Sequence, residues 1–240
     1  SEPWATPLAE ARLSSFLAAD KNNTDDGPEA FLSGGITDAQ ARYNLRNLID
    51  DTGKVIAVEA TGLRRLFESI GVAPELATRI TSSLREALAP VGSEGRPASP
   101  PLVPRTVSQL AWLGVDAESL RRITPYVVIL PGGRTTVNLN TASREVIAAS
   151  IEGLDLGAAE RLVQTRQRTP FKTLAEAQAA LPANVTAEST RVGVLSNFFE
   201  VRGRLRLGDR VLEELSLVER RGLDIVPLQR QRVSLRDSAG

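Results

Sequence analysis

The sequence lacks several residue types on which common protein chemistries depend. It contains no cysteine, no histidine and no methionine. Without cysteine or histidine the chain has no thiolate nucleophile, no Cys/His zinc site and no imidazole base, so most familiar enzyme mechanisms are excluded. The absence of cysteine fits either an oxidising or a reducing compartment, because a chain of 240 residues needs no disulfide to be stable.

An excess of one charge and a long apolar run are also lacking. The 29 Lys and Arg residues balance the 29 Asp and Glu residues, so no global field would draw the chain to nucleic acid or to an anionic membrane. No run of about 18 apolar residues is present, and no membrane span is therefore expected. Because methionine is absent, Ser1 is not a natural start, and we interpret the chain as a fragment of a longer protein.

The first segment with a periodic pattern is "PWATPLAEARLSSFLAADK". Apolar residues at helical spacing predict a helix here with one apolar stripe. The stripe consists of Ala9, Leu13, Phe16 and Leu17. It fits either an amphipathic helix on its own core or the exposed end of a longer helix that contacts partner helices. These four residues are therefore the candidate partner-binding residues.

Alternation of apolar and polar residues predicts strands at two places far apart in the sequence. The stretch "ITDAQARYNL" predicts one strand near residue 40, and three antiparallel strands are predicted after Asn197. Gly208 and Asp209 form a predicted two-residue turn that sets Arg204 opposite Glu213. We expect all four strands to share one sheet, packed on the first helix.

Between these strands the sequence has the pattern of short helices joined by glycine turns. The segments "IGVAPELATRI", "LGVDAESLRRI" and "EGLDLGAAERL" each hold a glycine that ends one helix, an apolar residue and a new helix. The stretch "APVGSEGRPASPPLVP" is a predicted long loop. The sequence thus predicts an α+β domain of residues 1–43 and 195–240, carrying an inserted all-α domain of residues 44–194 with helix-hairpin-helix-like repeats.

The last repeat has the arrangement of the hairpins that bind DNA. Such hairpins grip phosphate through a Gly-apolar-Gly turn, but this turn reads Asp155, Leu156, Gly157. A carboxylate would repel phosphate, so we interpret Asp155 as a helix cap, as we interpret Asp116. The preceding helix is expected to start at Asn140 or Thr141. Asn138 and Asn140 are expected to hydrogen-bond the backbone.

Two other functional classes are set against a purely structural role. A DNA-binding protein is the alternative function; it predicts affinity that falls with salt and is lost when Arg166 and Arg168 are replaced. An enzyme that uses carboxylates alone needs two carboxyl groups facing across a cleft. Glu213 and Glu214 are adjacent and point to opposite faces of a predicted strand, so nothing indicates such an enzyme.

Three stretches and the order in which they occur carry a resemblance to a known family. They are "ITDAQARYNLRNLI" at 36–49, "VNLNTASREVIAA" at 137–149 and "SNFFEVRGRLRL" at 196–207. The chain resembles the type II secretion system minor pseudopilin K family, also called general secretion pathway protein K. The resemblance covers nearly the whole chain, and only the family's hydrophobic N-terminal helix is missing.

The resemblance implies a pilin-like fold, with an N-terminal helix against an antiparallel sheet and a large inserted α-domain. It implies a non-catalytic protein that forms a heterotrimer with minor pseudopilins I and J at the tip of the pseudopilus, where it initiates and caps the fibre for protein export. Secreted proteins are further candidate partners, and nucleic acid is not a partner. The implied location is the bacterial inner membrane and periplasm, with this fragment in the periplasm and membrane contact only through the missing helix.

The resemblance also implies calcium, because relatives in the family are reported to bind it. Calcium takes several oxygen ligands from one flexible loop. The candidate ligands are Asp25 and Asp26 in "NNTDDGPE" and Asp50 and Asp51 in "LIDDTG". Neither stretch has a full calcium-loop pattern, and such clusters also form plain turns.

Overall fold

The computed structural model describes residues 6–13, 29–90 and 97–236, and the chain forms two compact units. The sheet unit contains Ser1–Ala39 and Asn197–Gly240, and the inserted unit contains Gln40–Ser196. The predicted boundaries fell after residues 43 and 194. Each unit is built from a different kind of element, strands in the first and mainly helices in the second.

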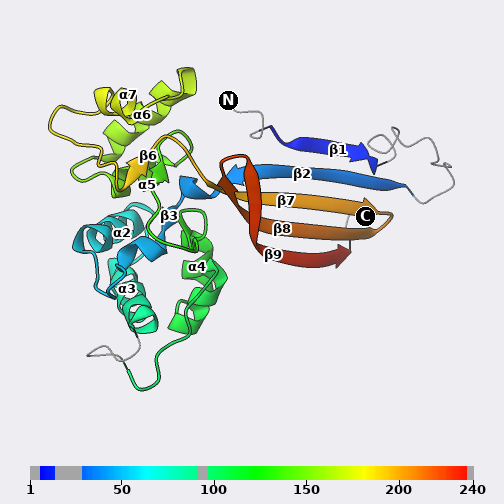
Figure 1. Cartoon of the computed structure of the whole chain (residues 1–240), viewed down its shortest axis with the longest axis horizontal. Helices are drawn as coiled ribbons and strands as arrows, with labels where there is room; N and C mark the ends of the chain where they lie inside the picture. Colours follow the sequence, from blue (N-terminus) through cyan, green and yellow to red (C-terminus); the bar gives the residue numbers. More distant parts are fainter. Residues whose placement is uncertain (1–5, 14–28, 91–96, 237–240) are drawn as a thin grey trace. The chain divides into compact units, whose positions relative to one another are not determined.

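The sheet unit consists of five antiparallel strands in the order β1-β2-β7-β8-β9 (Figure 1). The strands are β1 (Leu8–Arg12), β2 (Ala30–Asp38), β7 (Phe198–Leu207), β8 (Arg210–Arg221) and β9 (Asp224–Arg236). β2 and β7 are paired neighbours in the sheet, although the inserted unit separates them in the sequence. The prediction that an early strand shares one sheet with the last three strands is therefore confirmed.

The hairpin between β7 and β8 has the predicted register. Gly208 has a φ of +57°, which only glycine adopts at little cost, and it forms the turn with Asp209. Arg204 lies opposite Glu213, as predicted. Because each pair in an antiparallel register shares a face, this hairpin fixes which side chains lie on each side of the sheet.

The N-terminal helix prediction is wrong for Leu8–Arg12, because this stretch is the edge strand β1. Ala9 lies in β1, and β1 pairs with β2 through a register that shifts between Leu8 and Ala11. The apolar spacing of a segment this short fits both a helix and a strand. Pairing with β2 supplies backbone hydrogen bonds that an isolated helical turn would have to form alone, and this decides for the strand.

The strand predicted near residue 40 is displaced toward the N-terminus. β2 ends at Asp38, and Ala39–Ala41 form a 3-10 helix (η2) at the entry to the inserted unit. Gly34 and Gly35, which precede the predicted strand, lie within β2 and pair with β7. A Cβ on Gly34 would lie 2.4 Å from the Arg202 carbonyl oxygen, so the strand needs glycine at this close approach.

The inserted unit is built of short helices around one apolar core (Figure 1). Its α-helices are α2 (Ala57–Ser69), α3 (Pro74–Leu88), α4 (Ala117–Ile123), α5 (Arg144–Ser150), α6 (Leu156–Arg168) and α7 (Leu174–Ala179). Its 3-10 helices are η3 (Leu45–Leu48) and η4 (Val107–Leu113). Two small parallel sheets join β3 (Tyr43–Asn44) to β4 (Val127–Val128) and β5 (Val137–Asn138) to β6 (Val192–Gly193).

Three glycine turns precede α3, α4 and α6. Gly71, Gly114 and Gly153 have φ values of +70°, +78° and +74°, which end the preceding helices in the left-handed conformation. The residue after each glycine, Val72, Val115 or Leu154, is buried in the core. Each turn therefore places an apolar side chain between consecutive helices.

Two of the helix caps are the ones predicted from the sequence, and a third helix begins at a different residue from the one predicted. Asp116 and Asp155 accept the backbone N–H of Ser119 and Ala158 at 2.9 and 2.7 Å, so both predicted caps are confirmed. The start predicted at Asn140 or Thr141 is wrong, because Ser143 caps α5. Asn138–Thr141 are instead held in a turn by the Asn138 side chain and carbonyl.

None of the described helices combines the length and the apolar character that crossing a membrane requires.

Candidate functional site

One face of the sheet is apolar across β1, β2 and β7. On β8 this face includes Leu212 and Val218 but also Glu214 and Ser216, and Glu214 forms ion pairs there with Arg230 and Arg232 of β9. The register places Leu32, Leu205 and Leu212 side by side on this face, and Ile36 opposite Val201. Ala11, Ala30 and Leu207 share it. We call these apolar residues, together with Leu8, the apolar face. Within the described residues, every element of the sheet unit is a strand apart from Leu13 and from Ala39 at the start of η2, so no helix of these residues covers the apolar face.

Several large side chains of the apolar face are exposed. Leu8, Leu207 and Leu212 retain 44%, 41% and 39% of their accessible surface. At the centre of the face Gly34 lies opposite Gly203, and a Cβ on Gly203 would meet nothing within 4 Å. An apolar surface with a low point between rows of leucines suits close packing of another element, because contiguous exposed apolar patches mark interaction sites.

The opposite face of the sheet is charged. Arg206 donates to Glu10 at 2.8 Å and stacks 4.2 Å above the ring of Phe31, while Arg202 lies 3.7 Å from Glu213. The hydrogen bond from Arg206 lowers the pKa of the Glu10 carboxyl. Side chains paired in this way are suited to water, so the sheet is amphipathic.

The predicted partner-binding residues do not form a described stripe. Ala9 is exposed in β1, and Leu13 is partly buried just after that strand. Phe16 and Leu17 lie outside the described residues. The surface that sequence reasoning missed is the apolar face, whose signal was already present in the alternation of "FFEVRGRLRL".

The first stretch that carries the family resemblance holds the inserted unit together. Asn47 exchanges two hydrogen bonds with the backbone of Thr135, at 2.7 and 3.0 Å. Asn44 accepts the N–H of Leu130 at 3.1 Å, and Gln40 donates to the carbonyl of Thr136 at 2.7 Å. These amides satisfy backbone groups of the partly buried connection between β4 and β5, and their role is architectural.

The second stretch acts in the same way. Asn138 accepts the N–H of Asn140 at 2.9 Å and donates to Ser196 at 2.9 Å. Asn140 donates to the carbonyls of Phe171 and Val194 at 2.8 and 3.1 Å and accepts the Phe171 N–H at 2.9 Å. The expectation that both asparagines bond the backbone is confirmed.

The hairpin of α5 and α6 is not arranged to grip phosphate. The Asp155 carboxylate covers the start of α6, where a phosphate would have to sit. Arg166 donates to the carbonyl of Leu139 and is partly buried, so it serves the fold. Arg168 is exposed at the end of α6. The DNA-binding alternative is not supported.

The candidate calcium ligands that the structure describes are engaged in a turn. Oδ1 of Asp50 accepts the Thr52 N–H, the Thr52 hydroxyl and the Lys54 N–H at 2.9, 2.7 and 2.9 Å. The hydrogen bond from the Thr52 hydroxyl is the main cause of the lowered pKa of Asp50. Within the described ranges, Asp50 and Asp51 belong to no group of three or more acidic side chains. Calcium takes six to eight oxygen ligands, more than these two carboxylates supply alone. Asp25 and Asp26 lie outside the described residues.

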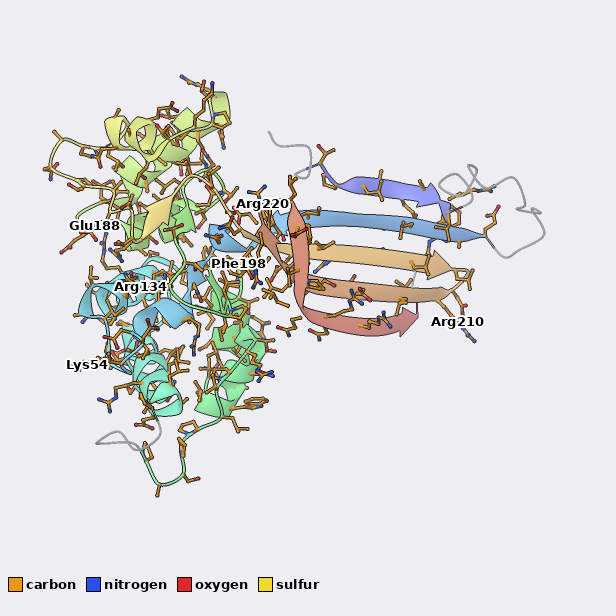
Figure 2. The ribbon with its side chains drawn as sticks, viewed as in Figure 1. Lys54, Arg134, Glu188, Phe198, Arg210 and Arg220 are labelled. Atoms are coloured by element: carbon orange, nitrogen blue, oxygen red, sulfur yellow. The ribbon has the colours of Figure 1, made fainter. Side chains whose placement is uncertain are left out.

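A buried ion pair, missed from the sequence, links distant parts of the inserted unit. Glu59 on α2 accepts from Nε and Nη2 of Arg191 at 3.1 and 3.4 Å, and from the Tyr43 hydroxyl at 2.7 Å. Arg134, labelled in Figure 2, approaches the same carboxylate at 3.4 Å. We call these four residues the Glu59 cluster. Burial, followed by the nearby Glu59 charge, raises the pKa of Tyr43 well above its usual value.

Comparison with known proteins finds relatives of one family along most of the chain. Two family models, both described as type II secretion system (T2SS), protein K, match residues 41–132 and 137–194. Type II secretion system protein K of Pectobacterium carotovorum subsp. carotovorum is 27% identical over 233 residues, which cover 86% of this chain and 70% of the relative. The protein of the same name from Dickeya chrysanthemi is 30% identical over 199 residues, covering 75% of this chain and 56% of that relative.

A solved structure shares the fold. A chain in the crystal structure of the GspK-GspI-GspJ complex from the type 2 secretion system of enterotoxigenic Escherichia coli aligns with a TM-score of 0.67 and 22% identity. The alignment covers 96% of this chain and 85% of that chain. Both units are therefore included in the likeness. The chain belongs to the type II secretion system protein K family.

Proposed function

We propose that this chain is the minor pseudopilin K of a type II secretion system, and that it assembles with minor pseudopilins I and J at the tip of the pseudopilus. Its family membership and the complex in which its structural neighbour was solved support this role. The role is structural and non-catalytic, in the initiation and capping of a fibre for protein export. Its place is the cell envelope, anchored in the inner membrane with this chain in the periplasm.

The apolar face is the observation in the structure itself that supports this role. We propose that it is the sheet surface of a pilin-like fold and that it packs against a helix. The inserted unit, with its three glycine turns, would be the bulk that prevents another subunit from adding above it. We interpret these turns as helix-hairpin-helix-like units that serve packing, because Asp155 and Arg166 are used within the fold.

The test is assembly in solution. The chain is mixed with the soluble domains of minor pseudopilins I and J from the same organism, and the mass of the complex is measured by size-exclusion chromatography with light scattering. The expected result is one complex that contains all three proteins. Failure to bind either pseudopilin, with all three proteins folded, would refute the proposed assembly.

Two variants connect the assembly to the apolar face. Leu207→Gln with Leu212→Gln removes apolar contact at two exposed positions, and each loss is worth about 1 kcal/mol if the side chain is buried by the partner. Assembly is then expected to weaken about tenfold or more. Arg202→Gln on the charged face is the matched control and should assemble like the unmodified chain.

Calcium binding is a separate proposal, which rests on the family resemblance and on Asp25 and Asp26. A thermal unfolding scan with added calcium and with a chelator would test it. Asp25→Asn with Asp26→Asn should abolish the stabilisation by calcium, and Asp50→Asn should leave it in place because Asp50 is held by Thr52 and Lys54.

A further inference from the structure

A groove of about 360 Å³ lies between α2 and α3 of the inserted unit. Two arginines, Arg64 and Arg85, line it together with four hydroxyl side chains, Thr61, Thr78, Thr81 and Ser82. We call it the α2–α3 groove. It is separate from the apolar face, which belongs to the sheet unit.

The spacing of these residues explains why they meet in one groove. Thr61 and Arg64 are three positions apart on α2, and Thr78, Ser82 and Arg85 follow one another at intervals of four and three on α3. Residues at such intervals lie on one side of a helix. The turn at Gly71 reverses the chain between α2 and α3, so the two polar stripes face one another.

The α2–α3 groove carries unbalanced positive charge. No carboxylate lines it, although the chain as a whole has as many acidic as basic residues. Arg64 and Arg85 are exposed, and neither side chain has an ion pair or hydrogen bond with any residue that the structure describes. Arg122 and Arg144, by contrast, pair with carboxylates on or beside their own helices. A third cation, Lys54, labelled in Figure 2, is exposed next to Val55 on the groove wall.

The groove presents hydrogen-bond donors as well as charge. The hydroxyls of Thr81 and Ser82 donate to the carbonyls of Ala77 and Thr78, both at 2.7 Å. Among the residues that the structure describes, the hydroxyls of Thr61 and Thr78 and the guanidinium groups of Arg64 and Arg85 have no hydrogen-bond partner, so their donors can face a ligand. Donors and positive charge together suit a group with several negatively charged oxygens.

We propose that the α2–α3 groove binds carboxylate side chains of an acidic segment of a partner protein. A guanidinium matches a carboxylate with two parallel hydrogen bonds, and two arginines can hold two carboxylates along one extended segment. Val55, which is 38% exposed, and Ala60 supply an apolar wall. Such a wall favours a peptide with apolar residues between its acids over a bare inorganic anion.

The test uses a fluorescently labelled peptide in which glutamate alternates with leucine, titrated with the whole chain at low and at high salt. Arg64→Gln with Arg85→Gln is expected to weaken binding of the peptide by up to about 25-fold, since each exposed charge pair contributes up to about fivefold. High salt should weaken binding to the unmodified chain as well, because surface charges are screened. Arg121→Gln with Arg168→Gln removes the same charge from exposed helix positions elsewhere and is the matched control.

Three results would overturn the proposal. They are no binding of the peptide to the unmodified chain, equal binding to both double variants, and displacement of the peptide by inorganic phosphate at the same concentration as by free peptide. Circular dichroism shows that each variant is folded. Because the groove is not part of the apolar face, both double variants should still assemble with minor pseudopilins I and J, so the two proposals fail independently.

Discussion

Replacing Glu59 tests whether the Glu59 cluster holds the inserted unit together. The side chains of Glu59 and Arg191 are 2% and 3% exposed, and the two residues are 132 positions apart in the sequence. Glu59→Gln keeps the shape of the side chain but removes its charge, and Arg191 then stays buried without a counter-ion. Breaking a buried pair in this way costs about 3–5 kcal/mol, a large share of the about 5–15 kcal/mol that stabilises a typical domain.

The geometry also predicts an asymmetry between the two partners. In Arg191→Met the Glu59 carboxylate keeps the Tyr43 hydroxyl at 2.7 Å and Arg134 at 3.4 Å, so part of its charge is still compensated. Arg191→Met should therefore cost less than Glu59→Gln. Glu59→Leu with Arg191→Met removes both charges, and it should cost less than the sum of the single variants because no unpaired charge is left buried.

The assay is urea unfolding, monitored by the circular dichroism signal of the α-helices, because all named α-helices lie in the inserted unit. Arg122→Met is the matched control: Arg122 pairs with Glu118 at 2.7 Å, but the two side chains are 53% and 63% exposed. An exposed pair contributes about 1 kcal/mol or less. If Glu59→Gln lowers the free energy of unfolding by no more than Arg122→Met does, the Glu59 cluster does not stabilise the inserted unit by the expected amount.

Three further predictions follow from single residues. Gly62→Ala should lower the unfolding temperature although alanine is the better helix former, because its Cβ would lie 2.7 Å from the Ala149 carbonyl; a stabilised variant would contradict the close contact of α2 with α5. Asp155→Ala should cost about 1 kcal/mol in urea unfolding and Asp155→Asn much less, since asparagine also caps helices; a gain of DNA binding in either variant, measured by fluorescence anisotropy, would count against the cap. The raised pKa of Tyr43 means that the folded state keeps a proton that the unfolded chain releases above about pH 10. The resulting stability is complete below that pH and is lost as pH rises toward the folded pKa, and Tyr43→Phe should remove this slope from alkaline unfolding curves.

Local features could be predicted from the sequence because their causes are local. In the caps at Asp116 and Asp155, a side-chain carboxylate oxygen accepts the backbone N–H of the residue three positions later in the sequence. The register of Arg204 with Glu213 depends on a two-residue turn and on alternation. The membership of one early strand in the final sheet followed from counting strands that need partners, and the structure confirms it.

Features that depend on distant contacts could not be predicted in this way. The stretch Leu8–Arg12 has a pattern that fits a helix, and only the free edge of β2 makes it a strand. α5 begins after its N-cap Ser143, while the Asn140 side chain bonds the backbone of Phe171 and Val194. Nothing near Glu59 in the sequence announces Arg191, since a buried charge is compensated by whichever residue the fold brings close.

The sequence by itself determined the kinds of element, most of the caps and turns, the division into strands and helices, and the family resemblance, because each depends on the order of neighbouring residues. The tertiary structure decided the edge strand β1, the amphipathic sheet with its exposed leucines, the Glu59 cluster and the charge of the α2–α3 groove. These depend on which surfaces meet, and only the three-dimensional packing of residues far apart in the chain settles that.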